Sequence, residues 1–297
     1  MTAESEATIL LGLIGAGIQA SRTPALHEKE AAEQGRRCIY KLIDLDRLAL
    51  GPDSLAELLT AAERMGFAGL NITHPCKQAI IPLLTQQSAD AAAIGAVNTV
   101  LLGDGKRIGH NTDWSGFAES FRRSLGGAPR ERVLQLGAGG AGAAVAYAAA
   151  KLGAGHLAIF DIDHTKSRAL ADKICGRFGA DRASAIVDIA SCVTTADGLI
   201  NTTPIGMEGH PGMPIASELL RHDLWVADVI YFPRETALLR AARAQGCATL
   251  DGCGMAVFQA AAAFQLFNGM PADPERMLRH FAAMDGATPP ASAGWRR

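Results

Sequence analysis

The sequence lacks an excess of charge of either sign. Its 28 lysine and arginine residues nearly balance its 30 aspartate and glutamate residues, which gives a formal net charge of −2 at pH 7. Proteins that bind nucleic acid or an anionic membrane surface concentrate basic residues in patches or runs, and no such block occurs in this chain. We therefore expect neither nucleic acid nor a membrane as a partner.

Long apolar runs and closely spaced cysteines are missing as well. No segment approaches the roughly 18 consecutive apolar residues of a membrane-spanning helix, and the first six residues, M-T-A-E-S-E, are unlike the basic start of a secretory signal peptide. The cysteines form no C-x-x-C motif and show no Cys/His spacing typical of zinc, which favours free thiols in a reducing compartment. They are Cys38, Cys76, Cys175, Cys192, Cys247 and Cys253. The sequence predicts a cytoplasmic protein without a metal site.

Strand-like and helix-like patterns alternate along the whole chain. Its 297 residues correspond to about two domains of roughly 100–200 residues each. The alternation predicts an α/β fold with two α/β domains, each built on a parallel sheet. We expect a substrate domain over residues 1–113, a Rossmann dinucleotide-binding domain over 114–251, and C-terminal helices over 252–297 that return to the first domain. The site should lie in the cleft between the two domains.

A glycine-rich segment carries the clearest signal. Residues 133–142 read V-L-Q-L-G-A-G-G-A-G, and the pattern G-x-G-x-x-G stands between a strand-like run and an Ala-rich, helix-like run over 143–152. Gly137 permits a tight turn, Gly139 lets a pyrophosphate approach the backbone, and Gly142 lets the helix pack closely on its strand. The N-terminus of the helix offers free N–H groups to the phosphates. The alternative is a tight turn that binds nothing, but the complete strand–turn–helix context favours a dinucleotide.

The next apolar run, residues 157–160, ends at Asp161, about 20 residues after the glycines. A carboxylate at this place accepts hydrogen bonds from a ribose 2′-hydroxyl and repels a 2′-phosphate. Lys166 and Arg168 lie nearby in the sequence and are most simply interpreted as helix-surface cations. The sequence therefore predicts NAD as the cofactor, with NADP as the alternative.

Polar residues interrupt apolar runs at three turns of the first domain. Asn71, Thr73 and Lys77 lie at or just past the end of one strand, which is where parallel sheets bind ligands. Asn98 follows a glycine turn, and Asp113 comes at the end of a short strand. Lys77 is either a catalytic residue or a solvated surface lysine, and Asp113 is either catalytic or the N-cap of the next helix. Position alone leaves both alternatives open.

Taken together, these motifs resemble the shikimate/quinate dehydrogenase family, from about residue 9 to about residue 284. Gln259 matches the family's late glutamine, and five ordered segments match its other patterns. They are N-I-T-H-P-C-K at 71–77, G-A-V-N-T at 95–99, G-H-N-T-D at 109–113, N-T-T-P-I-G-M at 201–207 and D-V-I-Y-F-P-R-E-T at 228–236. A methylene-tetrahydrofolate-type dehydrogenase would share the two-domain shape, but the last two segments favour the first family.

The resemblance implies an NAD(P)-dependent oxidoreductase that interconverts shikimate or quinate and the 3-dehydro ketone by hydride transfer, with Lys77 and Asp113 as its acid–base pair. Oxidising a ring hydroxyl needs a base for the proton, and which of the two carries it stays open. The side chains implied to contact this small polyhydroxylated cyclic carboxylate are Ser21, Thr23, Asn71, Thr73, Asn98, Tyr231 and Gln259. Those implied to contact the dinucleotide are Gly137, Ala138, Gly139, Gly140, Ala141, Gly142, Asp161, Asn201, Thr202, Thr203, Pro204, Met207, Val229 and Gly252.

The segment A-S-R-T-P at 20–24 departs from the family's commoner H-S-x-S-P. Ser21 and Thr23 are the residues implied to meet the substrate carboxylate. Threonine at the second position resembles the branch that uses quinate as well as shikimate, or an aminoshikimate-type branch. A different alternative is an inactive cofactor-binding regulator, which the presence of Lys77 and Asp113 disfavours. A monomer and a homodimer are both compatible with the sequence.

Overall fold

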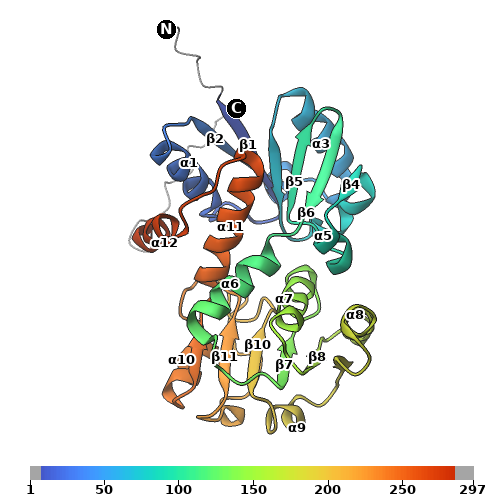
Figure 1. The fold of residues 1–297 in the computed structure, drawn as a ribbon, viewed down its shortest axis with the longest axis vertical. Coiled ribbons are helices and arrows are strands. Elements are labelled where there is room, and N and C mark those ends of the chain that lie inside the picture. Colours follow the sequence, from blue (N-terminus) through green and yellow to red (C-terminus); the bar gives the residue numbers. More distant parts are fainter. Residues whose placement is uncertain (1–7, 285–297) are drawn as a thin grey trace.

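The computed structural model describes residues 8–284, which form two six-stranded sheets with helices around them. Figure 1 shows one sheet in the upper half of the molecule and the other in the lower half, with α6 (Asp113–Leu125) and α11 (Gly252–Asn268) running between them. The predicted α/β fold with two α/β domains is confirmed. Within the described residues, no helix combines the length and the apolar character that crossing a membrane requires.

The first sheet has the strand order β2-β1-β3-β5-β6-β4. Strand β1 is parallel to both β2 and β3, and β4 is parallel to β6, whereas β5 is antiparallel to both β3 and β6. The prediction of a parallel first sheet is therefore wrong, because this sheet is mixed. Its strands are β1 (Ile9–Gly15), β2 (Cys38–Asp44), β3 (Gly69–Ile72), β4 (Gln86–Gln87), β5 (Thr99–Gly103) and β6 (Lys106–His110).

A tight turn explains the antiparallel pair β5–β6. Asp104 and Gly105 alone connect the two strands, with φ of 49° and 69°. Positive φ at both central positions is typical of the two-residue turns that join antiparallel strands, and parallel strands would need a much longer crossover. The hairpin brings the start of β5 beside the end of β6, where the Asn98 N–H donates to the His110 carbonyl at 3.1 Å.

Helices cover the first sheet through regularly spaced apolar side chains. Helix α3 buries Leu55, Leu59 and Ala62, which are spaced by about one helical turn, in the same core cluster as Ile72 of β3. The helical segments of this part of the chain are α1 (Thr23–Glu33), α2 (Leu45–Leu48), α3 (Leu55–Arg64), α4 (Cys76–Ala79) and α5 (Ala89–Ile94), with 3₁₀ turns η1 (Pro52–Ser54) and η2 (Ile81–Leu83).

The second sheet is parallel throughout, in the order β12-β11-β10-β7-β8-β9. This is the order of a doubly wound dinucleotide-binding fold, in which ligands bind at the carboxyl ends of the strands beside the point where the order reverses, here between β7 and β10. The strands are β7 (Arg132–Leu136), β8 (His156–Phe160), β9 (Ala183–Ala185), β10 (Gly198–Asn201), β11 (Trp225–Asp228) and β12 (Ala248–Leu250). The helices are α7 (Gly140–Lys151), α8 (His164–Phe178), α9 (Ile189–Val193), α10 (Ala237–Ala244) and the 3₁₀ turn η3 (Ser217–Leu219).

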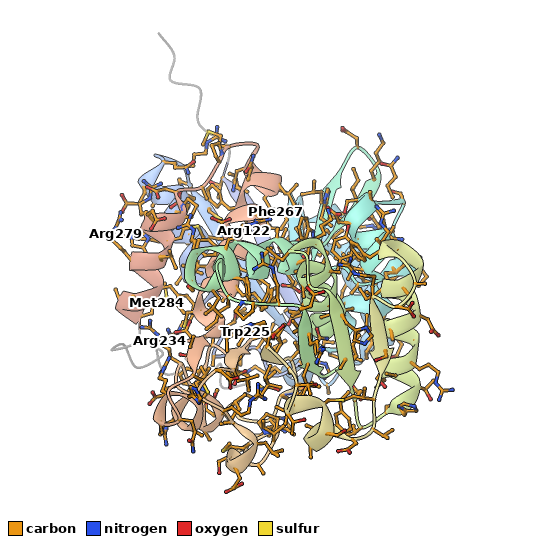
Figure 2. All side chains as sticks on the ribbon, turned by 60° about the horizontal axis from the view of Figure 1, so that its bottom comes forward. Arg122, Trp225, Arg234, Phe267, Arg279 and Met284 are labelled. Atoms are coloured by element: carbon orange, nitrogen blue, oxygen red, sulfur yellow. The ribbon has the colours of Figure 1, made fainter. Side chains whose placement is uncertain are left out.

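The chain returns to the first sheet through α11 and α12 (Pro274–Ala283), both of which contact α1. Arg276 of α12 forms two hydrogen bonds, of 2.9 and 2.6 Å, with the carboxylate of the fully buried Glu30 of α1. Phe267, labelled in Figure 2, lies near the end of α11 and packs directly on the backbone of Gly69 in β3. The last helices therefore close the first sheet on one side while α11 reaches down to the second.

Candidate active site

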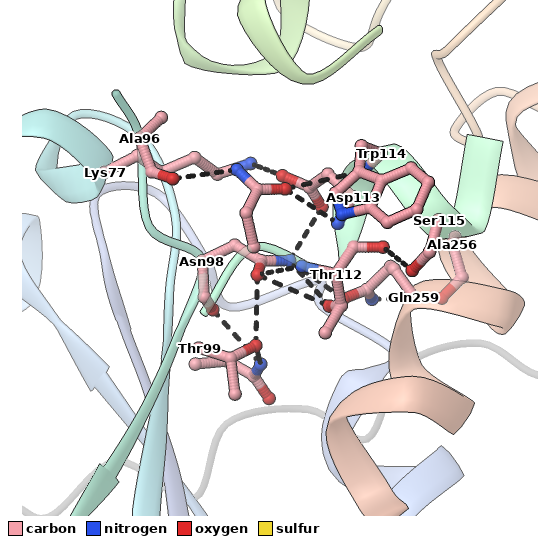
Figure 3. A network of polar contacts seen from close by, with 12 residues as sticks. Lys77, Ala96, Asn98, Thr99, Thr112, Asp113, Trp114, Ser115, Ala256 and Gln259 are labelled. Atoms are coloured by element: carbon pink, nitrogen blue, oxygen red, sulfur yellow. Dashed lines mark hydrogen bonds and ion pairs between the residues drawn. The ribbon is translucent and has the colours of Figure 1, made fainter. Parts of the chain in front are cut away.

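Lys77 and Asp113 form a close ion pair between the two halves of the molecule. The Nζ atom of Lys77, in α4, donates to the Oδ2 atom of Asp113 at 2.6 Å, and their side chains are 16% and 8% exposed. Figure 3 shows the two side chains pointing toward one another. Asp113 is the first residue of α6, and its own side chain does not cap that helix. Of the two interpretations open for Asp113, a helix N-cap is therefore excluded.

Asn98 holds the other oxygen of this carboxylate. Its Nδ2 atom donates to Oδ1 of Asp113 at 2.9 Å and to Oγ1 of Thr112 at 2.9 Å. Its Oδ1 atom accepts from the backbone N–H of Thr112 at 2.7 Å and from the hydroxyl of Thr99 at 3.0 Å. The amide of Asn98 is thus held at both ends, and the carboxylate of Asp113 has a partner on each oxygen. Lys77 and Asp113 are 36 positions apart in the sequence, and Asn98, which lies between them, brings β5 to the same group.

Gln259 reaches the same group of residues from α11. Its Oε1 atom lies 3.4 Å from Nδ2 of Asn98 and 3.4 Å from Oγ1 of Thr112. This approach requires that α6 and α11 pack with almost no side chain between them. A Cβ atom added at Gly116 of α6 would lie 2.7 Å from the backbone N of Gln259 and 2.7 Å from the carbonyl O of Met255. Gly116 therefore sets the distance at which Gln259 meets the site.

Ser21 and Thr23 lie together where α1 begins. The Ser21 hydroxyl donates to Oγ1 of Thr23 at 3.2 Å, and Thr23 is the first residue of α1. The N-terminus of a helix offers N–H groups and a positive dipole end to an anion. The loop that leads to Ser21 is held by Asp44, which accepts hydrogen bonds from the backbone N–H groups of Gly17 (3.1 Å) and Ile18 (3.2 Å).

The other three predicted substrate residues have different surroundings. Asn71 is 5% exposed and donates both Nδ2 hydrogens inward, to the carbonyl of Asn98 at 3.2 Å and to Oγ1 of Thr99 at 3.0 Å. Thr73 is half-buried, directly after β3. Tyr231 is half-buried and packs edge-on against Phe281 of α12, with ring centroids 6.1 Å apart.

The glycine turn has the shape that a dinucleotide pyrophosphate requires. Helix α7 begins at Gly140, inside the glycine pattern and three residues before the helix-like run of the sequence. Gly137 has φ +100°, and a Cβ added at Gly142 would lie 2.9 Å from Oγ1 of Thr202. A Cβ added at Gly139 would meet no protein atom within 4 Å, so its backbone faces open space. These residues fit a bound dinucleotide, because the turn is closed on its inner side and bare on its outer side.

The side chains of Thr202 and Gln135 hold the glycine turn through hydrogen bonds to its carbonyl groups. The hydroxyl of Thr202 donates to the carbonyls of Leu136 (2.8 Å) and Gly137 (3.0 Å). The fully buried Gln135 donates through Nε2 to the carbonyls of Gly137 and Gly142, both at 2.9 Å. The shape of the turn is therefore fixed by hydrogen bonds to its inward-facing carbonyls.

Asp161 closes the turn on the β8 side. Its Oδ2 atom accepts from the backbone N–H of Ala138 at 2.7 Å, and its Oδ1 atom accepts from the N–H of Asp163 at 2.9 Å. The carboxylate is half-buried, and Lys166 is paired with Asp163 at 3.7 Å. The predicted ribose partner thus lies directly at the glycine turn, and each of its oxygens keeps a further lone pair.

A second loop of the dinucleotide domain is organised by buried polar side chains. Asn201 is fully buried and accepts from the N–H and hydroxyl of Thr203 at 3.1 and 2.7 Å. Its Nδ2 atom donates to Asp228 at 3.1 Å, and Asp228 also accepts from the hydroxyl of Thr236 at 2.8 Å and the N–H of Ile230 at 3.1 Å. Burial raises the pKa of Asp228 to about 6, although these hydrogen bonds oppose the shift. Asn201 thus shapes the loop from inside.

The exposed part of this loop and the start of α11 hold the remaining predicted dinucleotide residues. Thr203 is half-buried, and Met207 is 39% exposed. The N–H of Val229 donates to the carbonyl of Asn201 at 3.1 Å, and Gly252 packs against the carbonyl of Val229 so closely that a Cβ would not fit. These positions line the carboxyl ends of β10 and β11. Pro204 lies in the same loop, whereas Ala138 lies in the glycine turn and Ala141 in the first turn of α7.

The Lys77–Asp113 ion pair lies directly beside the glycine turn. A Cβ atom added at Gly140 would lie 3.3 Å from Cδ and 3.4 Å from Cβ of Lys77. The aliphatic part of Lys77 therefore packs on the first residue of α7, and its ammonium group continues to Asp113. A ligand held by both the glycine turn and the Ser21–Thr23 loop would meet Lys77 between them.

Helix α5 is attached to the second domain at both of its ends. Asp90 of α5 accepts from the hydroxyl of Tyr147 at 2.5 Å and from Nζ of Lys151 at 3.2 Å, both on α7. At the other end, Nζ of Lys173 on α8 donates to the carbonyl of Ile94 at 3.2 Å. Because the segment that carries Asn98 follows α5 directly, these contacts hold that segment relative to the dinucleotide turn.

Sequence reasoning missed several residues that hold the site in place. Asp44 and Tyr40 belong to no motif, whereas Gln135 and Thr99 lie inside motifs that do not single them out. Tyr40 donates its hydroxyl to Oδ1 of Asn71 at 2.7 Å. A single aspartate at the carboxyl end of a parallel strand was the one available signal, and it applied to Asp44. Residues 8–284 contain no group of three or more His, Cys, Asp or Glu side chains placed to hold a metal ion.

Comparisons with known proteins agree with these observations. The Shikimate dehydrogenase substrate binding domain matches residues 13–100, and the Shikimate 5'-dehydrogenase C-terminal domain matches residues 252–280. A shikimate dehydrogenase (NADP(+)) of Streptomyces avermitilis is 54% identical over 279 residues, which cover 93% of this chain and 96% of the relative. A quinate/shikimate dehydrogenase (NAD(+)) of Corynebacterium glutamicum is 48% identical, covering 93% of this chain and 99% of the relative.

A solved structure shares the whole fold. The quinate dehydrogenase of Corynebacterium glutamicum in complex with NAD superimposes with a TM-score of 0.86 at 46% sequence identity, covering 93% of this chain and 99% of that one. The similarity therefore extends over both domains and over the residues that join them.

Proposed function

Because this chain belongs to the shikimate dehydrogenase family, we propose that it is an NAD(P)-dependent oxidoreductase that interconverts shikimate or quinate and the corresponding 3-dehydro ketone. The observation that carries the proposal is the Lys77–Asp113 pair, with an Nζ–Oδ2 distance of 2.6 Å, beside the dinucleotide turn. A bound nicotinamide dinucleotide supplies the hydride acceptor or donor for this reaction.

Lys77 and Asp113 move the proton that accompanies the hydride. When a ring hydroxyl is oxidised, its proton leaves oxygen and passes to the pair; when the ketone is reduced, the Lys77 ammonium donates a hydrogen bond to the carbonyl oxygen and then the proton. Asp113 keeps the ammonium directed, because one of its oxygens accepts from Lys77 and the other from Asn98. The two side chains act as one coupled group.

The remaining polar residues recognise the substrate. Ser21 and Thr23 bind the carboxylate at the N-terminus of α1, where N–H groups and the helix dipole favour an anion. Thr73 and Gln259 bind ring hydroxyls, since hydroxyl and amide groups both donate and accept hydrogen bonds. Asn98 joins them by exchanging its Nδ2 bond to Thr112 for a bond to the substrate. Tyr231 and the one remaining acceptor site on Asn71 complete this set.

The direct test is a substrate panel with the purified protein. Shikimate, quinate and amino-substituted analogues are each offered with NAD and with NADP, and reduced nicotinamide is followed by its absorbance. We expect turnover of shikimate, quinate or both. Turnover of an amino-substituted acid alone would support the aminoshikimate-type alternative, and cofactor binding without turnover of any acid would support the regulator.

We propose NAD as the preferred cofactor, because Asp161 presents a carboxylate at the glycine turn, and folds of this type use an acidic residue in this position to bind the ribose 2′-hydroxyl. Asp161→Ala should lower the ratio of kcat/KM for NAD to that for NADP by about 10–100-fold, since a hydrogen bond to a charged group is lost and repulsion of the 2′-phosphate disappears. Asp161→Asn is the matched variant, since it keeps an acceptor for the Ala138 N–H and removes only the charge. Higher kcat/KM with NADP in the unmutated protein would refute the assignment and point to Lys166 or Arg168.

We also propose that quinate is a substrate, because Thr23, the first residue of α1, is one of the two residues proposed to bind the carboxylate. Quinate differs from shikimate by a saturated ring carbon with an extra hydroxyl beside the carboxylate. Threonine keeps the hydroxyl but adds a methyl group and restricts χ1. Thr23→Ser should therefore shift the ratio of kcat/KM for quinate and shikimate toward shikimate, by about 10–200-fold at most for one methyl group. An unchanged ratio would show that Thr23 does not select the substrate.

A further inference from the structure

Behind the acid–base pair lies a directed chain of hydrogen bonds. The hydroxyl of Tyr40 donates to Oδ1 of Asn71 at 2.7 Å, and Nδ2 of Asn71 donates to Oγ1 of Thr99 at 3.0 Å. The Thr99 hydroxyl then donates to Oδ1 of Asn98 at 3.0 Å, and Nδ2 of Asn98 donates to Oδ1 of Asp113 at 2.9 Å. Every donor therefore points the same way, from the edge strand β2 to the carboxylate.

The chain is buried along its length. Tyr40 is 6% exposed, Asn71 5%, Asn98 3% and Thr99 0%. In such surroundings hydrogen bonds polarise one another, and an unpaired polar group is costly. Burial raises the pKa of Tyr40 well above its usual value near 10, so its oxygen stays protonated and remains a donor.

The ring of Tyr40 packs against other aromatic rings. Its ring lies 5.0 Å, centroid to centroid, from that of His27, which is fully buried against Phe264 and Phe267. Burial lowers the pKa of His27 to about 3, and neither ring nitrogen has a hydrogen-bond partner among the described residues. His27 is therefore a neutral packing residue that holds the Tyr40 ring, and the hydroxyl is directed to Asn71.

We propose that Tyr40 is a positioning residue for the Lys77–Asp113 pair, acting through three buried side chains. They are Asn71, Thr99 and Asn98. The Tyr40 hydroxyl and the Asn98 carbonyl together fix which end of the Asn71 amide faces Thr99. This choice makes Thr99 an acceptor from Asn71 and leaves its hydrogen for Asn98. The inference rests on the proposed function, since it concerns the proton-transfer step of that reaction.

Loss of the hydroxyl releases this constraint. Without the Tyr40 hydroxyl, Oδ1 of Asn71 is a buried acceptor that has lost its partner, and the amide is held only by its Nδ2 bonds to the Asn98 carbonyl and to Thr99. The amide shifts to regain a donor, which weakens its bond to Thr99 and, through Thr99, the bond that orients the Asn98 amide toward Asp113. The backbone N–H of Thr112 still holds Asn98, so the expected effect is moderate.

The test is Tyr40→Phe, which keeps the ring against His27 and removes only the hydroxyl. We expect kcat to fall by about 10-fold, the equivalent of one buried hydrogen bond, while KM for the dinucleotide stays unchanged. Thr99→Val interrupts the chain at a second link and should have a similar effect. In the double variant the two losses should not multiply, because both substitutions break one chain.

Ser167→Ala is the matched control. It removes a fully buried hydroxyl that donates to the carbonyl of His164 within α8, and it should change thermal stability at most, with kcat unchanged. Wild-type kcat in Tyr40→Phe, or losses that multiply in the double variant, would overturn the inference while leaving the proposed function intact. Absence of turnover in the unmutated protein would overturn both. If Tyr40→Phe does not fold, Thr99→Val tests the inference by itself, and its kcat is again expected to fall by about 10-fold.

Discussion

Lys77→Ala is expected to lower kcat by about 10²–10⁴-fold, the usual contribution of a positioned acid–base group. The substitution removes the ammonium group that lies 2.6 Å from Asp113 and leaves that carboxylate, 8% exposed, with Asn98 as its remaining side-chain partner. Because Lys77 contacts Gly140 only through its aliphatic part, the affinity for the dinucleotide should change little. Steady-state kinetics and a dinucleotide titration of the same preparation measure the two quantities separately.

Lys29→Ala is the control for this experiment. Lys29 is 55% exposed and pairs with Glu33 on the same helix at 3.4 Å, so its removal tests the general effect of losing one surface lysine. Its kcat should equal that of the unmutated protein. Turnover near the wild-type level in Lys77→Ala would remove lysine from the mechanism and leave Asp113 as the proton-transfer group.

Gly116→Ala is expected to have the largest effect on the fold at the site. The added methyl carbon would lie 2.7 Å from two backbone atoms of α11, the N of Gln259 and the O of Met255. Neither atom can move alone, so α6 and α11 must separate. Overpacking of this kind costs about 1–3 kcal/mol of the free energy of unfolding. The shift also moves Gln259 away from Thr112 and Asn98, so KM for the ring acid should rise.

Gly176→Ala tests the same substitution without the contact. Gly176 lies inside α8, and a Cβ there would meet nothing within 4 Å. This variant should be stabilised by about 0.5–1 kcal/mol, because alanine is favoured over glycine inside a helix. Chemical denaturation of both variants gives the comparison. Equal stability of Gly116→Ala and the unmutated protein would show that the helix pair adjusts without cost.

The elements that the sequence predicted best are those defined by local pattern. The glycine turn, its strand and its helix follow one another within 20 residues. Two of its glycines have a local steric reason in the structure, since Gly137 has φ +100° and a Cβ at Gly142 would lie 2.9 Å from Oγ1 of Thr202. The start of α7 was placed three residues too late, because Gly140 and Ala141 read as turn rather than as helix.

Contacts between segments far apart in the sequence could not be predicted from it. The antiparallel pairing of β5 with β3 joins segments about 30 residues apart and depends on which edge the chain returns to, for which no local pattern exists. The same holds for the candidate site. Lys77, Asn98 and Asp113 belong to motifs and were named, whereas Tyr40 meets Asn71 only because β2, β1 and β3 are adjacent in the sheet.

The β5–β6 hairpin allows residues to be inserted at its turn without changing the distance between Asn98 and Asp113. Asn98 and Asp113 stand at the open end of the hairpin, and its turn at Asp104 and Gly105 lies about 17 Å away, at about 3.4 Å per residue. The ladder between the strands fixes the open end, so residues added at the turn cost only loop closure, about 0.6 kcal/mol for each doubling of loop length. For protein engineering, a reporter, tag or tether can therefore be inserted at this turn of the substrate domain while Asn98 and Asp113 keep their relative positions.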